Sequence, residues 1–163
     1  MTATFLTDSI KRFEYYKELG DKTLDLLTTD DVNYSPHPAT CNSIATIVVH
    51  LYGNMLSRWT DFLTTDGEKD WRRRNEEFLG TTYTKNDVMS FWNEGWKICL
   101  DTLKKLEASD LEKTIYIRQE PLTVYDAILR QLAHYPYHIG QMVYLGKMIT
   151  QQRWINLSIP TTK

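Results

Sequence analysis

The chain has 163 residues, which is enough for a single compact domain, residues 1–163, whose core needs no cross-links. Hydrophobic residues make up 42% of it, and the seven glycines and five prolines are too few for many short strands and tight turns, so helices are favoured. Nineteen basic residues against 21 acidic ones give a formal net charge of −2, which argues against nucleic acid or an anionic membrane surface as a partner.

The first half of the chain predicts two long helices joined by a loop, because its apolar residues recur near the helical period. The first helix covers about residues 5–27, and Gly20 could mark a bend in it. A loop containing Pro36 and Pro38 follows. The second helix begins at Asn42, a good N-cap, and runs to about residue 63.

The second half predicts two further long helices. Thr84, with Asp87 three residues later, resembles a capping box and starts a helix over about residues 85–107. Residues 114–119 alternate apolar and polar side chains, as an extended segment does, but are too short to found a sheet. Thr123 with Asp126 marks the start of the last helix, which runs to about residue 149. We therefore expect an all-α protein built as a four-helix bundle.

The sequence carries no sign of export or membrane insertion. Cys41 and Cys99 lie far apart and form no Cys-x-x-Cys pair, so we expect two buried thiols and neither a disulfide framework nor a thiolate zinc site. Residues 1–8 lack a basic start and an apolar run, and no segment approaches the roughly 20 apolar residues that span a bilayer. These features predict a cytoplasmic protein.

Three adjacent arginines at positions 72–74 have two interpretations. They could receive a phosphate or a carboxylate group. Because Glu76 and Glu77 follow at once, the favoured interpretation is a solvated, partly paired turn whose ends, Trp71 and Phe78, are anchored in the core.

Two histidines four residues apart, His134 and His138, fall on one face of the last predicted helix. Their directions differ by roughly 40° and their heights by about 6 Å, which suits two imidazoles that bind one ion. Pro136 between them removes one backbone hydrogen bond and could either aim the ligands or spoil the spacing. Spacing alone does not separate a metal site from two histidines that fall four apart by chance.

A third histidine, His50, occupies a similar edge on the second helix. It starts a polar stripe that continues at helical spacings with Asn54, Ser57, Arg58 and Asp61. Taken singly, His50 is more often a satisfied buried histidine than a ligand, and His37, in a loop between two prolines, is interpreted as an ordinary exposed residue. Three neutral imidazoles suit Zn²⁺, Ni²⁺ or Fe²⁺ and leave a coordination position open for water or substrate.

The same residues resemble a known superfamily. The run His134-Tyr135-Pro136-Tyr137-His138-Ile139-Gly140-Gln141, with residues 42–45 and 49–51, resembles the DinB/YfiT-like superfamily of metal-binding helical bundles. Residues 53–63, 71–74, 77–78 and 157–160 look like an uncharacterised bacterial branch of it, so the resemblance spans nearly the whole chain. A proline at position 136 departs from the pattern, and this departure concerns the ligand geometry rather than the identity of the ligands.

The resemblance implies a fold, a metal and a chemistry. The bundle would have up-down-down-up topology and often form a homodimer. One histidine on the second helix and two on the fourth would hold a divalent metal, and they match His50, His134 and His138 one for one. Zn²⁺ or Ni²⁺ is expected first, with Fe²⁺ or Mn²⁺ as alternatives. Better-characterised relatives transfer the thiols bacillithiol or mycothiol, or use a thiol in isomerisation, whereas early family descriptions proposed hydrolases.

Three functions remain open at this point. The leading hypothesis is a metal-dependent thiol S-transferase that acts on a small molecule, in which Asn54 and Arg58 would orient a polar substrate or thiol cofactor. A hydrolase of a small ester or amide also needs a general base, and Asp61, about three turns from His50, is too far along the helix to reach the ion. A non-catalytic, metal-stabilised binding bundle is the third, although structural sites usually have four protein ligands.

Overall fold

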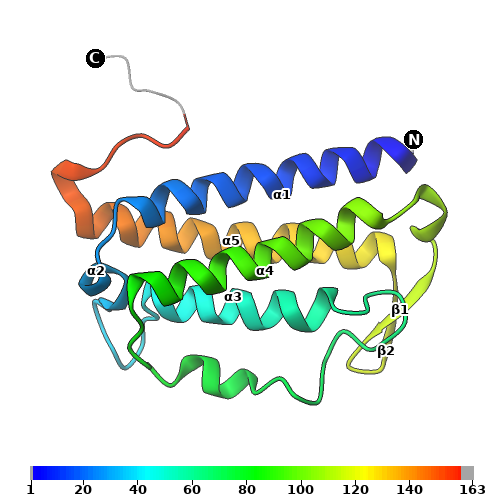
Figure 1. Cartoon of the computed structure of the whole chain (residues 1–163), viewed down its shortest axis with the longest axis horizontal. Helices are drawn as coiled ribbons and strands as arrows, with labels where there is room; N and C mark the ends of the chain where they lie inside the picture. Colours follow the sequence, from blue (N-terminus) through cyan, green and yellow to red (C-terminus); the bar gives the residue numbers. More distant parts are fainter. Residues whose placement is uncertain (1, 159–163) are drawn as a thin grey trace.

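The computed structural model describes residues 2–158, and four long helices form its framework (Figure 1). They are α1 (Thr2–Asp25), α3 (Ile44–Trp59), α4 (Lys85–Lys105) and α5 (Val124–Thr150). Helices α1 and α5 run in one direction and α3 and α4 in the other, which confirms the all-α bundle with up-down-down-up topology. In the run 157–160 used for the resemblance, Ile159 and Pro160 lie outside the described residues, as does Met1.

The helix starts follow local capping chemistry. Thr84 and Asp87 form the predicted capping box of α4, and the Thr123 side chain accepts a hydrogen bond from the Asp126 amide at the start of α5. The expected N-cap of the second helix is wrong by one residue, because Ser43 rather than Asn42 accepts the first amide hydrogen bond of α3. This helix also ends at Trp59, four residues before the predicted end.

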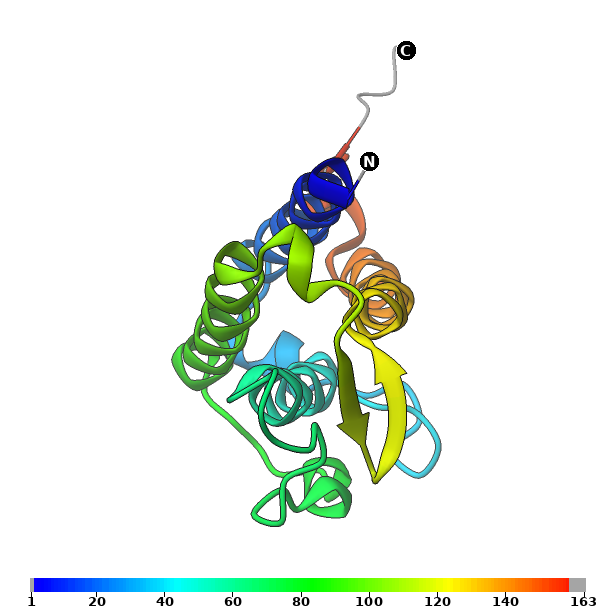
Figure 2. The same cartoon turned by 90° about the vertical axis from the view of Figure 1, so that its right-hand side faces the viewer.

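Short elements connect the long helices. Helix α2 (Thr29–Asn33) forms where the sequence predicted only a loop, because a second capping box closes its first turn. Three 3-10 helices follow among the described residues: η1 (Arg74–Phe78), η2 (Ala108–Asp110) and η3 (Gln151–Arg153). Seen along the bundle, the segment with η1 lies outside α3 (Figure 2).

The predicted extended segment pairs with the residues that follow it. Strands β1 (Thr114–Ile117) and β2 (Glu120–Thr123) form an antiparallel hairpin with Ile117 opposite Glu120. The segment therefore does found a small sheet, contrary to expectation, because the chain supplies its own partner strand two residues later. Figure 2 shows this hairpin beside α5, in front of the end of the bundle.

A buried aromatic cluster sets the position of α5 relative to α3. Phe13 of α1 lies 5.8 Å from Tyr135 between ring centroids, and Trp96 of α4 lies 5.7 Å from the same ring. The Trp59 indole donates a hydrogen bond of 2.9 Å to the Tyr135 hydroxyl, which in turn donates to Asn54 over 3.1 Å. Because Tyr135 directly follows His134, this network also places the histidine-bearing face of α5 opposite α3.

The structure shows the surroundings of Gly20 and of the two cysteines. Helix α1 continues through Gly20 to Asp25, and the glycine makes room for Trp92, since a Cβ at this position would clash with the indole ring. Cys99 is buried as expected, but Cys41 is exposed. Among the helices of residues 2–158, none is long and apolar enough to cross a membrane.

Candidate metal centre

The two histidines of α5 point to the same place. His134 and His138 are half-buried, and their Nε2 atoms lie 3.1 Å apart. Helix α5 continues through Pro136, so the four-residue spacing still puts both rings on one face. The proline therefore leaves the predicted pairing of the two imidazoles intact.

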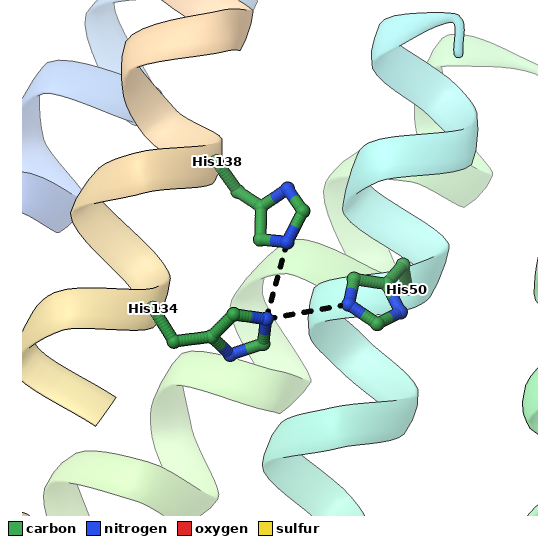
Figure 3. A group of neighbouring side chains, drawn as sticks. All are labelled: His50, His134 and His138. Carbon is green, nitrogen blue, oxygen red and sulfur yellow. Dashed lines mark hydrogen bonds between the residues drawn. The ribbon is translucent and has the colours of Figure 1, made fainter. Parts of the chain in front are cut away.

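His50 completes the cluster from α3. Its Nε2 lies 3.4 Å from that of His134, and one ligand atom from each of the three histidines lies within 4.8 Å of the others (Figure 3). Ligands about 2.0–2.1 Å from a tetrahedral ion are roughly 3.3–3.4 Å from one another. The two separations that involve His134, 3.1 and 3.4 Å, fit imidazole nitrogens around one divalent ion, and the sequence-predicted set His50, His134 and His138 is brought together.

A buried carboxylate fixes the orientation of His50. Glu77 Oε2 accepts a hydrogen bond of 2.8 Å from His50 Nδ1, and Arg72 donates to both oxygens of Glu77 over 2.8 and 3.0 Å. Burial alone would raise the pKa of Glu77, but hydrogen bonds from His50 and Arg72 more than offset this, so the pKa lies below its usual value. The ionised carboxylate holds the proton on Nδ1 and leaves the Nε2 lone pair free for a metal.

Gly53, one turn after His50, makes the approach of Glu77 possible. A Cβ at position 53 would overlap the Glu77 carboxylate. The missing side chain lets the carboxylate lie against α3, where it reaches the ring of His50.

A second hydrogen bond orients His134 in the same way. The side-chain oxygen of Gln131, one turn earlier on α5, lies 3.3 Å from His134 Nδ1. With Nδ1 as the donor, the Nε2 lone pair of His134 faces that of His50 at 3.4 Å. Two lone pairs repel at this separation, and a cation between them converts the repulsion into coordination. The ring orientations thus fit an ion better than they fit a closed hydrogen-bond network.

Both histidines of α5 resist protonation. Burial lowers the pKa of His134 to about 3, and the neighbouring His138 and His50 add to the effect. Burial also lowers the pKa of His138 to about 4, with a further contribution from His50. The rings are therefore neutral near pH 7, the state in which imidazole binds metal.

The cluster opens into a cavity of about 410 Å³. Its walls carry Phe78 and ten polar side chains from α3, α5, the segment around η1 and the hairpin, namely His50, Asn54, Arg58, Arg72, Arg74, Arg118, Arg130, Gln131, His134 and His138. The two residues predicted to orient a substrate, Asn54 and Arg58, both line this cavity, whereas His37 is exposed outside it. Ser57 and Asp61, which continue the polar stripe in sequence, do not line it.

The interpretation of residues 71–78 as a solvated turn is wrong in two respects. Trp71, expected to anchor the segment, is 55% exposed. Arg72, expected to be solvated, has a side chain that is only 2% exposed because it is paired with Glu77. Sequence reasoning also missed Glu77 as the partner of His50, since 27 residues and a loop without periodicity separate them. A glycine one turn after the histidine was the only local signal.

The comparisons with known proteins agree with this fold. The family described as "Protein of unknown function (DUF1572)", which is DinB-like, matches residues 1–163. A crystal structure of a DinB-like protein from Bacillus cereus is similar, with a TM-score of 0.65 and 15% sequence identity over 86% of this chain and 90% of that chain. At such low identity the similarity shows the fold alone. No protein of curated function matches the sequence.

Proposed function

The chain belongs to the DUF1572 family, and from this premise we propose that it is a divalent-metal-dependent enzyme that transfers a low-molecular-weight thiol to a small electrophile. The observation that carries the proposal is the convergence of three histidine Nε2 atoms at the wall of a cavity of about 410 Å³. Thiol transfer itself is taken from the resemblance of the histidine motif to thiol-using members of the DinB/YfiT-like superfamily.

The three histidines would hold Zn²⁺ or Ni²⁺ and leave one position facing the cavity. A bound divalent ion supplies positive charge that lowers the pKa of a thiol and favours the thiolate. Glu77 and Gln131 keep His50 and His134 in the metal-binding tautomer. Asn54 and Arg58 lie on the cavity wall one and two turns beyond His50, where they would orient the substrate.

The cavity wall also bears on hydrolysis. Among residues 2–158, no aspartate or glutamate lines the cavity. Glu77 is the nearest acid to the cluster that we identify, and its two oxygens are occupied by His50 and Arg72. Hydrolysis of an ester or amide is aided by an acid or base that transfers a proton to the leaving group, whereas attack by a metal-bound thiolate that displaces an anion needs no such group. The arrangement therefore favours transfer over hydrolysis.

The test uses full-length protein purified without a nickel column, stripped of metal and reloaded with one equivalent of Zn²⁺ or Ni²⁺. Several low-molecular-weight thiols are offered with a chlorinated aromatic electrophile. The carbon–sulfur bond forms as chloride leaves and the thiol proton passes to buffer, so thioether and chloride are measured together. We expect turnover that depends on the metal, disappears in His134→Ala and persists in His37→Ala. Stoichiometric metal binding without metal-dependent turnover for any thiol would overturn the proposal.

A further inference from the structure

Five arginines line the same cavity as the histidines: Arg58, Arg72, Arg74, Arg118 and Arg130. The chain as a whole carries a formal charge of −2, so the basic character is local to this site. Two carboxylates, Glu68 and Glu77, pair with three of these arginines. Five positive charges against two negative ones leave an excess of three before any metal is bound.

Two of these arginines, Arg58 and Arg130, are displaced from the histidines toward one end of the α3–α5 contact. On α3, Arg58 lies eight residues after His50, and on α5, Arg130 lies four and eight residues before His134 and His138. Residues at four-residue steps share one helix face. Because α3 and α5 run in opposite directions (Figure 1), the histidines meet at one end and the two arginines lie toward the other. One step of four corresponds to about 6 Å along the axis.

Arg58 lines the cavity and carries one hydrogen-bond donor that no described residue uses. Its side chain is only 7% exposed, and it donates to the Gly67 carbonyl and, over 3.1 Å, to Glu68. Its Nε is buried and has no hydrogen-bond partner among the described residues. A buried guanidinium nitrogen without an acceptor is costly, and an acceptor on a ligand would satisfy it.

Arg74 and Arg130 are the arginines of this wall that no acid neutralises. Within residues 2–158, neither has an ion pair with an acidic side chain, and Arg74 lies 5.3 Å from the centroid of the Phe78 ring. Both residues are exposed, so they lie where a ligand would enter. Guanidinium groups with free donors bind carboxylate and phosphate oxygens through paired hydrogen bonds.

We propose that these arginines form a subsite for the oxyanion, carboxylate or phosphate, of a small-molecule substrate. Arg74 and Arg130 bind the anion at the mouth, and the Arg58 guanidinium provides a further donor within. This inference rests on the proposed function in one respect, because it assumes that the substrate reacts at the histidines. The anionic group of that substrate would then lie roughly 6–12 Å along the helix axis from the reacting atom. A recessed cavity of about 410 Å³ suits a small molecule rather than a nucleic acid strand.

The test measures the binding of inorganic phosphate and of malonate to the metal-free, full-length protein by titration calorimetry at low ionic strength. Metal-free protein is used so that coordination to an ion does not contribute. We expect Arg74→Gln and Arg130→Gln each to weaken binding about tenfold, since each removes charge-assisted hydrogen bonds. Arg73→Gln, next in sequence but absent from the cavity wall, and Lys147→Gln, farther along α5, are the matched controls and should bind as the wild type does.

The outcomes separate this subsite from the proposed function. The subsite is overturned if neither anion binds the wild type, or if the control variants weaken binding as much as Arg74→Gln and Arg130→Gln do. Arginine-dependent binding together with an absence of metal-dependent thiol turnover supports the subsite and overturns the proposed function. Binding of phosphate alone or of malonate alone supports the subsite and assigns the class of oxyanion. Thermal melting of each variant checks that the fold is retained.

Discussion

At the α1–α4 contact and beside the α3–α5 contact, a glycine makes room for a side chain of another element, but the two side chains have different roles. In the first, Gly20 makes room for the indole of Trp92, whose Nε1 donates to Asp21 over 2.6 Å. Beside the second, Gly53 makes room for the carboxylate of Glu77, which orients a histidine. The α1–α4 contact is filled by an aromatic ring, whereas the α3–α5 contact holds both the buried Trp59–Tyr135 hydrogen bond and part of the wall of a cavity of about 410 Å³. The bundle thus keeps the packed α1–α4 contact apart from the candidate binding cavity.

The largest loss of stability is expected when the side chain that fills the α1–α4 contact, Trp92, is removed. Trp92 is 2% exposed, so Trp92→Ala should lower the free energy of unfolding by about 3–5 kcal/mol through lost burial and the cavity it leaves. Denaturant unfolding measures the change. Trp71→Ala, at a residue that is 55% exposed, is the control and should change stability by less than about 0.5 kcal/mol. Equal losses for the two variants would contradict the assignment of the core.

A substitution in the histidine cluster should lower metal affinity and leave the stability of the metal-free protein nearly unchanged. His134→Ala removes one of the three candidate ligands, so we expect metal affinity to fall more than about 100-fold, beyond the effect of changing a residue that only contacts a ligand. Competition with a chromogenic chelator measures the affinity, and elemental analysis measures the stoichiometry. The metal-free variant should melt within a few degrees of the metal-free wild type. A variant that loses its fold together with its metal would show that the two regions are not separate.

A smaller loss of metal affinity is expected at Glu77, which contacts His50 but does not belong to the histidine cluster. Glu77→Gln keeps the shape of the side chain but removes the charge that holds the proton on His50 Nδ1, so metal affinity should fall about 10–100-fold. Glu76→Gln, at an exposed neighbour, is the matched control. The same chelator competition serves for both. If Glu76→Gln and Glu77→Gln behaved alike, the carboxylate–histidine contact would have no role in the site.

A further prediction concerns the pH dependence of the metal-free protein. In the folded protein the pKa values of His134 and His138 are lowered from 6.5 to about 3 and about 4, so below pH 6.5 the unfolded chain takes up protons first. These residues therefore favour folding above pH 6.5, and that contribution is lost as pH falls from 6.5 to about 4 for His138 and to about 3 for His134. Denaturant midpoints of metal-free protein measured from pH 7 downward should show the decline. The decline should be shallower in the double variant His134→Ala/His138→Ala, and parallel curves would refute the contribution.

The parts of the fold that the sequence predicted are those decided by neighbouring residues. The Thr84–Asp87 capping box and the Thr123 N-cap are interactions within one turn, so the starts of α4 and α5 were predicted correctly. The pairing of His134 with His138 follows from helix geometry alone. Helix α2 was missed because its five residues are mostly turn-forming types and too few to show a period.

The parts that the sequence did not predict depend on packing between distant segments. The Glu77 carboxylate reaches His50 only because η1 packs against α3 at Gly53, which no spacing rule reveals. Arg74 and Arg118 reach the cavity from η1 and from the hairpin, elements whose positions are set by tertiary contacts. Sequence patterns therefore predicted the histidine cluster on the regular helices. They raised an anion site at residues 72–74 without favouring it, and they missed Glu77 and Arg118 on the connections.

The turn of the β1–β2 hairpin places Arg118 at the cavity wall in a strained backbone conformation. Arg118 and Gln119 have positive φ angles of 56° and 65°, and their amides are held by the Asp66 carboxylate over 2.9 and 2.7 Å. Asparagine followed by glycine adopts this turn with far less strain, so Arg118→Asn with Gln119→Gly should raise the free energy of unfolding by about 1–2 kcal/mol. The same change would remove a guanidinium from the cavity wall. A more stable turn would therefore lower the positive charge of the cavity wall, and the natural residues retain the less stable arrangement.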